Sequence, residues 1–158
     1  MTRAGTTKYF SNKQEKDVAK KFNARKVVAS GAIWFSKADV RSSEFLIECK
    51  TTGKIYYSLT AKIWEKIEKE AIKDHMRTPL MVIDFEHGKD RLIVFRTKDF
   101  DMDINDMSFP AKKSVRINPI DSDGHIYVIC GEKNNVICCM NPQDFNNVYE
   151  ARYKNAKQ

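Results

Sequence analysis

Residues 39–50 of the chain have the sequence DVRSSEFLIECK. Residues 45–47 are an apolar run of strand-forming side chains. The polar residues 41–44 before that run are typical of a hairpin connection between two strands. The sequence therefore predicts a β-hairpin, whose second strand ends in charged residues interleaved with apolar ones and is buried on at least one face.

Three charged side chains of this hairpin are expected to meet. Glu48 and Lys50 are two residues apart, so on a strand they share one face, and the hairpin brings Asp39 close to that face. Two hard carboxylate ligands suit a divalent cation such as magnesium, and an adjacent lysine can hold an anion or a nucleophilic water. The alternative is a solvated sheet edge whose charges discourage aggregation.

Composition bounds the class of protein. The chain has 158 residues, of which 42% are hydrophobic and 31% charged, which fits one globular domain over 1–158 with a core of its own. No run reaches the ~18 apolar residues of a membrane span, and residues 1–8 lack the apolar centre of a signal peptide. We therefore expect a cytoplasmic protein without membrane contact.

The net charge indicates the class of partner, and the cysteine pattern indicates the redox compartment. Lysine and arginine number 28 against 21 acidic residues, a net charge of +7, which favours polyanionic partners, nucleic acid above all. The cysteines are Cys49, Cys130, Cys138 and Cys139. They lie in apolar runs without the spacing of zinc ligands, so we expect buried thiols in a reducing compartment.

A first helix is predicted over 11–23. Ser11 and Gln14 form a capping box at its start, and Glu15 heads an apolar stripe on one face. The stripe continues through Val18, Ala19 and Phe22. Glu15 is thus expected at the rim of the core, or alternatively only as a charge that favours the positive helix N-terminus.

Ser30 and Gly31 interrupt the strand pattern that begins at residues 27–29. A glycine lets the backbone approach a ligand closely, and backbone N–H groups beside a hydroxyl suit a phosphate. An ordinary turn is the alternative. The extended segment that follows, residues 34–40, delivers Asp39 to the hairpin.

A strongly amphipathic helix is predicted over 59–74, capped by Ser58 or Thr60. Lys54 and Lys62 flank its start, where they either contact phosphates or are ordinary exposed lysines. Strands are expected at 80–85 and 91–95, which gives the strand–helix–strand crossover of an α/β fold.

The last third of the chain is expected to contain a second hairpin and a final helix. The hairpin strands are predicted at 126–130 and 136–140, and the helix starts with Pro142 at its first position. We therefore expect an α/β fold with a core of about 10–96 and a small extension, hairpin plus helix, over about 97–158.

The pattern of Asp39, eight intervening residues and then Glu48-Cys49-Lys50 resembles the core of the PD-(D/E)XK nucleases, although Ala38 stands where their signature has a proline. The order of the elements that carry Glu15, Ser30 and these residues resembles the Holliday junction resolvases of the archaeal and phage type within that superfamily. The resemblance covers about residues 10–96. It implies a restriction-endonuclease-like mixed central sheet flanked by the 11–23 and 59–74 helices.

The resemblance also implies an activity, that of a magnesium-dependent endodeoxyribonuclease which resolves Holliday junctions in DNA recombination and repair. Asp39, Glu48 and the Cys49 carbonyl would bind the metal, for which manganese would substitute, and Lys50 would orient or activate the attacking water. Glu15 would hold a second metal or its water. Ser30 would touch the scissile phosphate, and the expected DNA contacts are Ser30, Gly31, Lys37, Lys54 and Lys62.

The expected partner is four-way or otherwise branched DNA, cut by a homodimer with one active centre per chain. Tyr56, Tyr57 and Tyr127 are candidates for the dimer interface, although each could equally belong to the core. A phage-encoded protein would act in the host cytoplasm. The alternatives are another nuclease of the same superfamily (restriction, homing, nicking or repair type) and a non-catalytic basic module that binds nucleic acid.

Overall fold

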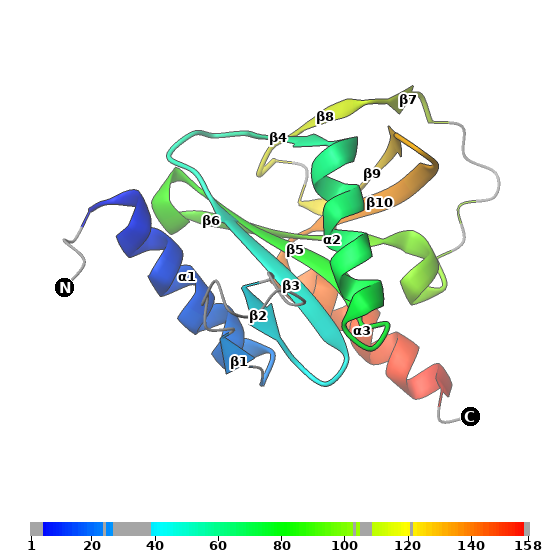
Figure 1. Ribbon diagram of the computed structural model, residues 1–158, viewed down its shortest axis with the longest axis horizontal. Helices are drawn as coiled ribbons and strands as arrows, with labels where there is room; N and C mark the ends of the chain where they lie inside the picture. Colours follow the sequence, from blue (N-terminus) through cyan, green and yellow to red (C-terminus); the bar gives the residue numbers. More distant parts are fainter. Residues whose placement is uncertain are drawn as a thin grey trace.

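The structure is a computed structural model that describes residues 5–23, 25–26, 39–102, 104, 109–120 and 122–156. A mixed sheet runs through the middle of the molecule, with helices on both of its faces (Figure 1). The helices are α1 (Thr7–Lys21), α2 (Ala61–Lys73) and α3 (Pro142–Ala156), with short 3-10 turns η1 (Glu86–Gly88) and η2 (Thr97–Phe100). Among these described helices, none is long and apolar enough to cross a membrane.

The described strands form one large sheet and one small one. The strands are β1 (Arg25–Lys26), β2 (Val40–Arg41), β3 (Phe45–Thr51), β4 (Tyr57–Thr60), β5 (Thr78–Phe85), β6 (Asp90–Arg96), β7 (Ala111–Lys112), β8 (Ser114–Ile117), β9 (Asp123–Cys130) and β10 (Asn134–Met140). The large sheet has the order β1-β2-β3-β5-β6-β10-β9-β7, and β4 pairs with β8. β3 and β5 are parallel, across the connection that contains α2. The predicted α/β fold, a mixed central sheet flanked by helices, is confirmed.

β5 is buried on both faces because helices pack against both sides of the sheet at this strand. Side chains alternate along a strand, so Val82 faces one way, into a cluster with Phe145 of α3. Met81 faces the other way, into a cluster with Trp64 of α2. An unbroken apolar run is what a strand covered on both faces requires, and it explains why residues 80–85 were recognisable in the sequence.

α1 begins one turn earlier than predicted, so the capping box of Ser11 with Gln14 is wrong. Thr6 is the N-cap, and its Oγ1 accepts a hydrogen bond from the Tyr9 N–H at 3.2 Å. Thr6 and Ser11 are both suitable capping residues. The earlier one is used because the added turn packs Phe10, which stacks on the His87 ring at 4.4 Å between centroids; Gln14 turns into the interior instead.

α2 follows its prediction closely. The Thr60 Oγ1 accepts a hydrogen bond from the Ile63 N–H at 3.2 Å, and the helix ends at the C-cap Asp74. Trp64 and Ala71 are among the side chains buried on its inner face. Thr60 rather than Ser58 is the cap because Thr60 is the last residue of β4 and directly precedes the helix, whereas Ser58 lies within the strand.

The predicted C-terminal hairpin and helix are present, and the hairpin continues the main sheet. β9 and β10 pair with each other, and β10 also pairs with β6 from Ile137 opposite Arg96 to Met140 opposite Ile93. The helix α3 then packs Phe145 into the cluster on the α1 side of the sheet. The sheet therefore does not end near residue 96.

A chain truncated after residue 100 is expected not to fold as a monomer. The truncation unpairs β6 and removes apolar side chains that are buried in the intact molecule, namely Ile129, Ile137, Cys138, Cys139, Met140 and Phe145. Each such side chain contributes roughly 1.5–3 kcal/mol, so together they approach or exceed the stability of a typical domain, roughly 5–15 kcal/mol. Circular dichroism during heating tests this, and a cooperative transition near that of the full chain would contradict it.

Candidate active site

Asp39 lies directly before β2 and beside the strand that carries Glu48. β2 and β3 pair with Val40 opposite Ile47, and one step further this register sets Asp39 opposite Glu48. The Asp39 carboxylate reaches the backbone of β3, where its Oδ2 accepts a hydrogen bond from the Cys49 N–H at 2.8 Å. The hairpin register and this hydrogen bond together fix where the carboxylate lies.

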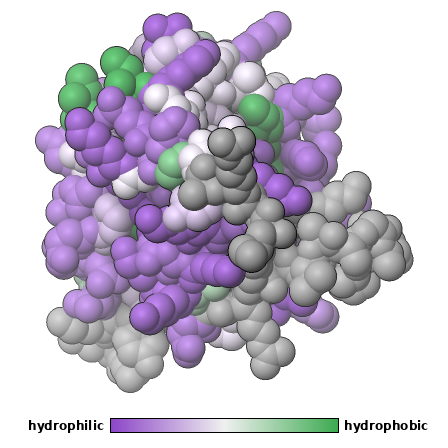
Figure 2. Space-filling view, turned by 90° about the vertical axis from the view of Figure 1, so that its left-hand side faces the viewer, coloured by the Kyte–Doolittle hydropathy of each residue, from purple (hydrophilic) through white to green (hydrophobic). Residues whose placement is uncertain are grey.

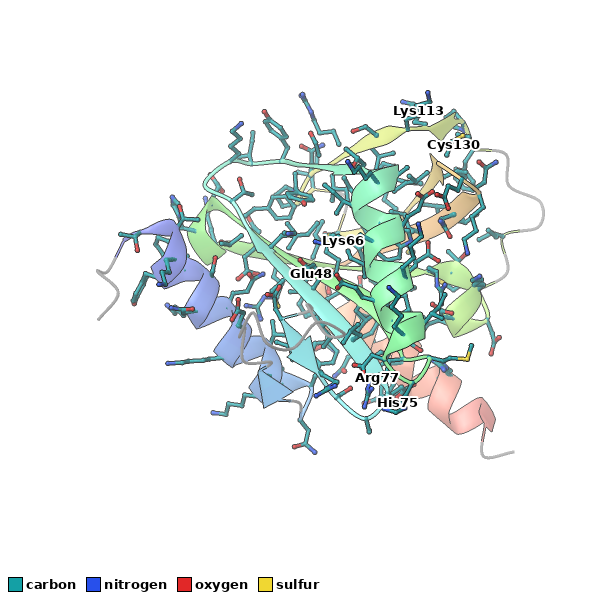
Figure 3. All side chains as sticks on the ribbon, viewed as in Figure 1. Glu48, Lys66, His75, Arg77, Lys113 and Cys130 are labelled. Carbon is teal, nitrogen blue, oxygen red and sulfur yellow. The ribbon has the colours of Figure 1, made fainter. Side chains whose placement is uncertain are left out.

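Glu48 and Lys50 lie on the same face of β3, with the Lys50 Nζ 3.0 Å from the Glu48 Oε1. Leu46, two residues earlier, packs on Ala71, so this is the face covered by α2. Figure 3 shows Glu48 beneath α2, near Lys66 of that helix. Burial raises the pKa of Glu48, and the positive charges of Lys50 and Lys66 only partly oppose this.

The two carboxylates repel each other in a partly desolvated place. Burial raises the pKa of Asp39 to about 6, and the negative charges of Glu48 and, less strongly, Glu15 add to the effect. The Cys49 N–H acts in the opposite direction. At neutral pH the site therefore holds negative charge that the fold itself does not fully compensate.

Lys50 stays protonated at neutral pH. Burial disfavours its charge, but the Glu48 carboxylate outweighs burial, so the pKa of Lys50 is raised. Tyr57 of β4 is close enough to influence this group. Burial also raises the pKa of Tyr57, against the effect of Lys50, so both side chains can act as hydrogen-bond donors near Glu48.

Gln14 joins α1 to the strand that carries the charged residues. Its Nε2 donates hydrogen bonds to the Lys50 carbonyl at 2.8 Å and the Val82 carbonyl at 3.1 Å. The side chain is 2% exposed. Sequence analysis assigned Gln14 to a capping box, yet its separation of four residues from the buried Val18 is the signal that it lies on the inner face of α1.

Glu15 brings a third carboxylate close to the hairpin from α1. Its negative charge raises the pKa of both Asp39 and Cys49. For the Cys49 thiol burial is the larger cause, followed by the charge of Asp39. The structure thus brings Glu15, Asp39, Glu48 and Lys50 into one electrostatic neighbourhood.

The oxygens of Asp39 and Glu48 suit a hard divalent cation. Their mutual repulsion is the penalty that a cation between them would remove, and the backbone carbonyl of Cys49 is a further oxygen of the same kind. In the part of the chain that the structure describes, no group of three or more His, Cys, Asp or Glu side chains that could hold a metal ion is found.

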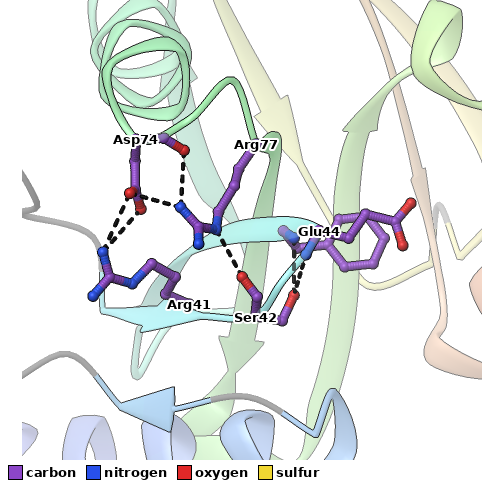
Figure 4. A network of polar contacts seen from close by, with 6 residues as sticks. Arg41, Ser42, Glu44, Asp74 and Arg77 are labelled. Carbon is purple, nitrogen blue, oxygen red and sulfur yellow. Dashed lines mark hydrogen bonds and ion pairs between the residues drawn. The ribbon is translucent and has the colours of Figure 1, made fainter.

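The turn of the hairpin is clamped to the end of α2 by a buried ion-pair network (Figure 4). Asp74, whose side chain is 2% exposed, lies 2.6 Å from Arg77 and 3.2 Å from Arg41. The Arg77 Nε donates a hydrogen bond to the Ser42 carbonyl at 2.7 Å. Because Arg41 is two residues from Asp39, the clamp also sets the position of the candidate site.

The other side of the same turn is held by α3. The Tyr149 hydroxyl lies 3.0 Å from the Glu44 Oε2, and Arg152 forms an ion pair with Glu44 at 3.3 Å. Neither this contact nor the Asp74 network was recognised in the sequence, because both connect the turn to residues more than thirty positions away.

The remaining predicted site residues are placed only in part. Ser30, Gly31 and Lys37 lie outside the described residues. Lys54 is exposed in the turn after β3, with its Nζ 3.5 Å from the Tyr56 hydroxyl, and Lys62 is exposed in the first turn of α2.

The three tyrosines proposed for a dimer interface have contacts within the chain. Tyr57 and Tyr127 pack against the core cluster on the α2 side. The Tyr56 ring receives the Arg116 guanidinium at 4.2 Å from its centroid. These contacts fit the alternative that the tyrosines belong to the packed interior and its rim.

No protein-family model and no curated protein sequence matches the chain. Its structure is similar to that of Hjc, a Holliday junction resolvase from the archaeal hyperthermophile Archaeoglobus fulgidus. The similarity covers 86% of this chain and 92% of that chain, at 12% sequence identity and a TM-score of 0.42. At this level the chemistry has to be argued from the residues of the present chain.

The substitution Asp39→Asn is expected to stabilise the metal-free protein at pH 7.5. Because the folded-state pKa of Asp39 is raised to about 6 from the ordinary 3.8, ionisation costs stability as pH rises through that window, and the full cost applies above it. After a discount for solvent screening the gain is about 1–2 kcal/mol. Urea unfolding in EDTA measures it.

The stability difference between Asp39→Asn and the parent chain should shrink as pH falls toward 4, where the parent carboxyl is protonated in the folded state. Asp90→Asn, at an exposed carboxylate that starts β6, is the control and should change stability by less than ~0.5 kcal/mol. If Asp39→Asn is no more stable than the parent chain at pH 7.5, repulsion between the carboxylates does not destabilise the folded protein.

Asp74→Asn is expected to lower the free energy of unfolding by about 1–3 kcal/mol, because it removes the buried counter-charge of Arg77 and of the partly exposed Arg41. Glu132→Gln breaks an exposed ion pair with Lys69 and should cost at most ~0.5 kcal/mol. Chemical denaturation of the two variants makes the comparison. Equal effects of the two substitutions would show that the clamp is not a stabilising contact.

Proposed function

We propose that the chain is a metal-dependent DNA endonuclease that hydrolyses phosphodiester bonds, with branched DNA as its substrate. The observation that carries the proposal is the pair of carboxylates, Asp39 and Glu48, set side by side with the Lys50 Nζ 3.0 Å from Glu48. Two acidic groups with raised pKa and one protonated lysine within a single hairpin are the parts that phosphodiester hydrolysis needs.

Asp39 and Glu48 would hold a magnesium ion together with the Cys49 carbonyl, and manganese is expected to substitute. Such an ion lowers the pKa of a bound water and offsets charge that builds up on the phosphate. The orientation of the Asp39 carboxylate is fixed, because its Oδ2 accepts a hydrogen bond from the Cys49 N–H at 2.8 Å. Glu15, on the α1 side, would supply a further carboxylate for a second ion or its water.

Lys50 acts as a cation in this proposal. Its raised pKa keeps the ammonium protonated, so it donates hydrogen bonds to an attacking water or to a phosphate oxygen. It does not accept the proton of the water at neutral pH. Lys50 therefore positions the nucleophile and balances charge.

DNA as the substrate follows from charge and from the type of site. The chain carries a net charge of +7, which favours association with the phosphates of a nucleic acid. We propose four-way junction DNA as the form of substrate, because the order of the elements that carry the site resembles that of the archaeal and phage-type Holliday junction resolvases. Two symmetric cuts in a junction need two active centres, so we propose a homodimer with two-fold symmetry.

Cleavage of labelled DNA by two variants tests the enzyme. Asp39→Asn should lower the rate at least ~100-fold, on the scale of losing a major electrostatic stabiliser. Glu15→Gln should also abolish most of the activity while its melting temperature stays within a few degrees of that of the parent chain. DNA binding without metal should persist in both variants, because it depends on basic side chains elsewhere.

Asp90→Asn again serves as the control and should retain full activity. Near wild-type cleavage by Asp39→Asn would exclude that carboxylate from the site. Full activity of Glu15→Gln at physiological magnesium would show that Glu15 is not part of the active site and only favours the positive N-terminus of the helix.

The substrate is tested with a panel of duplex, flap, single-stranded and four-way junction DNA in magnesium. The proposal predicts paired cuts in opposite strands of the junction and a dimer by light scattering on that DNA. Equal cleavage of plain duplex, or a monomer on the junction, would favour a general nuclease of the same chemistry. Binding without cleavage of any of these DNAs would favour a non-catalytic module.

A further inference from the structure

A groove of about 490 Å³ lies between α1 and the turn that joins β5 to β6. Its lining includes Phe10, Gln14, Thr51 and His87, together with lysines of α1. The groove lies on the side of the molecule where α1 runs along the sheet (Figure 1), and Figure 2 shows that this side is mostly hydrophilic. The proposed active site does not use this groove.

One wall of the groove is a row of exposed lysines. Lys13, Lys16 and Lys20 all line it, and their spacing of three and four residues places them on one face of α1. At a rise of 1.5 Å per residue the row is about 10 Å long. A row of ammonium groups of this length suits successive phosphates of one nucleic acid strand.

The acidic residues that line the groove are paired with an arginine. Arg91 donates hydrogen bonds to both oxygens of Asp84, at 2.6 and 3.0 Å, and also to Asp17. Burial opposes the charge of Arg91, but these carboxylates outweigh it and raise its pKa. Arg91 therefore compensates both acids within the groove, and the lysine row supplies the positive charge that remains for a ligand.

An aromatic pair closes one end of the groove. The Phe10 ring stacks on the exposed His87 ring at 4.4 Å between centroids and 26° between planes. His87 is held at φ 60, a backbone conformation that non-glycine residues adopt at a cost. Gly53 keeps room for it, because a Cβ at that position would lie 2.9 Å from the His87 Nε2.

The inner end of the groove touches the strand that carries the candidate site. Thr51, which lines the groove, is the residue after Lys50. Gln14, which also lines it, is hydrogen bonded to the Lys50 carbonyl, and its buried Oε1 has no hydrogen-bond partner among the residues that the structure describes. A buried acceptor without a donor is uncommon and marks a place where a ligand or an ordered water can donate.

We propose that this groove binds an unpaired DNA strand on the α1 side of the strand that carries the proposed cleavage site, with its phosphates on the row of Lys13, Lys16 and Lys20 and a base stacked on the Phe10–His87 pair. Lysines combined with an aromatic platform are the combination that binds single strands, since an unpaired base exposes its face for stacking. A base inside a duplex does not. The inference rests on the proposed nuclease function, and it adds that branched DNA is bound through a segment left unpaired at the branch point.

The test uses binding by the full chain carrying Asp39→Asn, in EDTA, to two DNAs of equal length, one fully duplex and one with an unpaired arm. Three lysines of the groove are changed together (Lys13→Ser, Lys16→Ser, Lys20→Ser). The matched control changes three exposed lysines on other elements (Lys73→Ser, Lys98→Ser, Lys112→Ser), so that both proteins lose the same net charge. Fluorescence anisotropy over a range of salt concentrations gives the affinities.

The parent should bind the forked DNA at least about fivefold more tightly than the duplex. The groove variant should lose this preference, and its salt dependence on forked DNA should fall by about 2 in slope. The control variant should bind both DNAs more weakly and keep the preference. The proposal is overturned if the preference survives in the groove variant or is lost equally in the control.

A second variant examines the aromatic end. Phe10→Leu keeps an apolar side chain on α1, and 2-aminopurine in the unpaired arm reports stacking through its fluorescence. The parent should quench this probe and the variant should not; equal quenching would reject the platform.

Cleavage by the unsubstituted chain in magnesium separates the two proposals. Cleavage without tighter binding to the forked DNA rejects the groove alone, and tighter binding to the forked DNA without cleavage rejects the nuclease alone.

Discussion

The register of β2 against β3 is the constraint on which the candidate site depends. Val40 lies opposite Ile47, and both are buried in the cluster on the α1 side. Since side chains alternate along a strand, a slip by one residue would turn that buried pair outward and carry Asp39 away from Glu48. The hydrophobic pattern of the hairpin therefore fixes the distance between two charged groups that have no attraction of their own.

The molecule treats its buried charges in two different ways. Asp74 lies between two arginines, and Glu68, 3% exposed, is paired with Arg96 at 2.8 Å. These acids are compensated within the fold and join helix α2 to the sheet. The contacts that favour the charged form of Asp39 are weaker than the burial and repulsion that oppose it, so its pKa is raised to about 6. A carboxylate left uncompensated in this way is available for chemistry, whereas a compensated one has a structural role.

Much of the fold could be predicted because its signals are local. The apolar run of residues 80–85, the cap at Thr60 and the proline that starts α3 act within a few residues, and each gave the correct element. The start of α1 could not be chosen between Thr6 and Ser11, because the deciding contact joins Phe10 to a ring more than seventy residues away. For the same reason the sequence did not indicate that β10 would pair with β6.

The site shows the same division. The spacing of Glu48 and Lys50 is enough to place both on one face, whereas the supports of the hairpin, Asp74 and Gln14, come from other elements. Their residue types are ordinary, and only the three-dimensional arrangement gives them a role. Sequence patterns thus identify reactive groups more readily than the side chains that hold those groups in place.

The thiol between the two charged residues of β3 has a consequence for the choice of metal. Burial and the nearby carboxylates raise the pKa of Cys49, so at neutral pH its sulfur is a neutral thiol packed toward the α1 side of the sheet. Soft ions such as zinc are bound by the thiolate form. A cation held by Asp39 and Glu48, as proposed, would therefore be offered oxygen donors by this strand, which favours hard ions over soft, thiophilic ones.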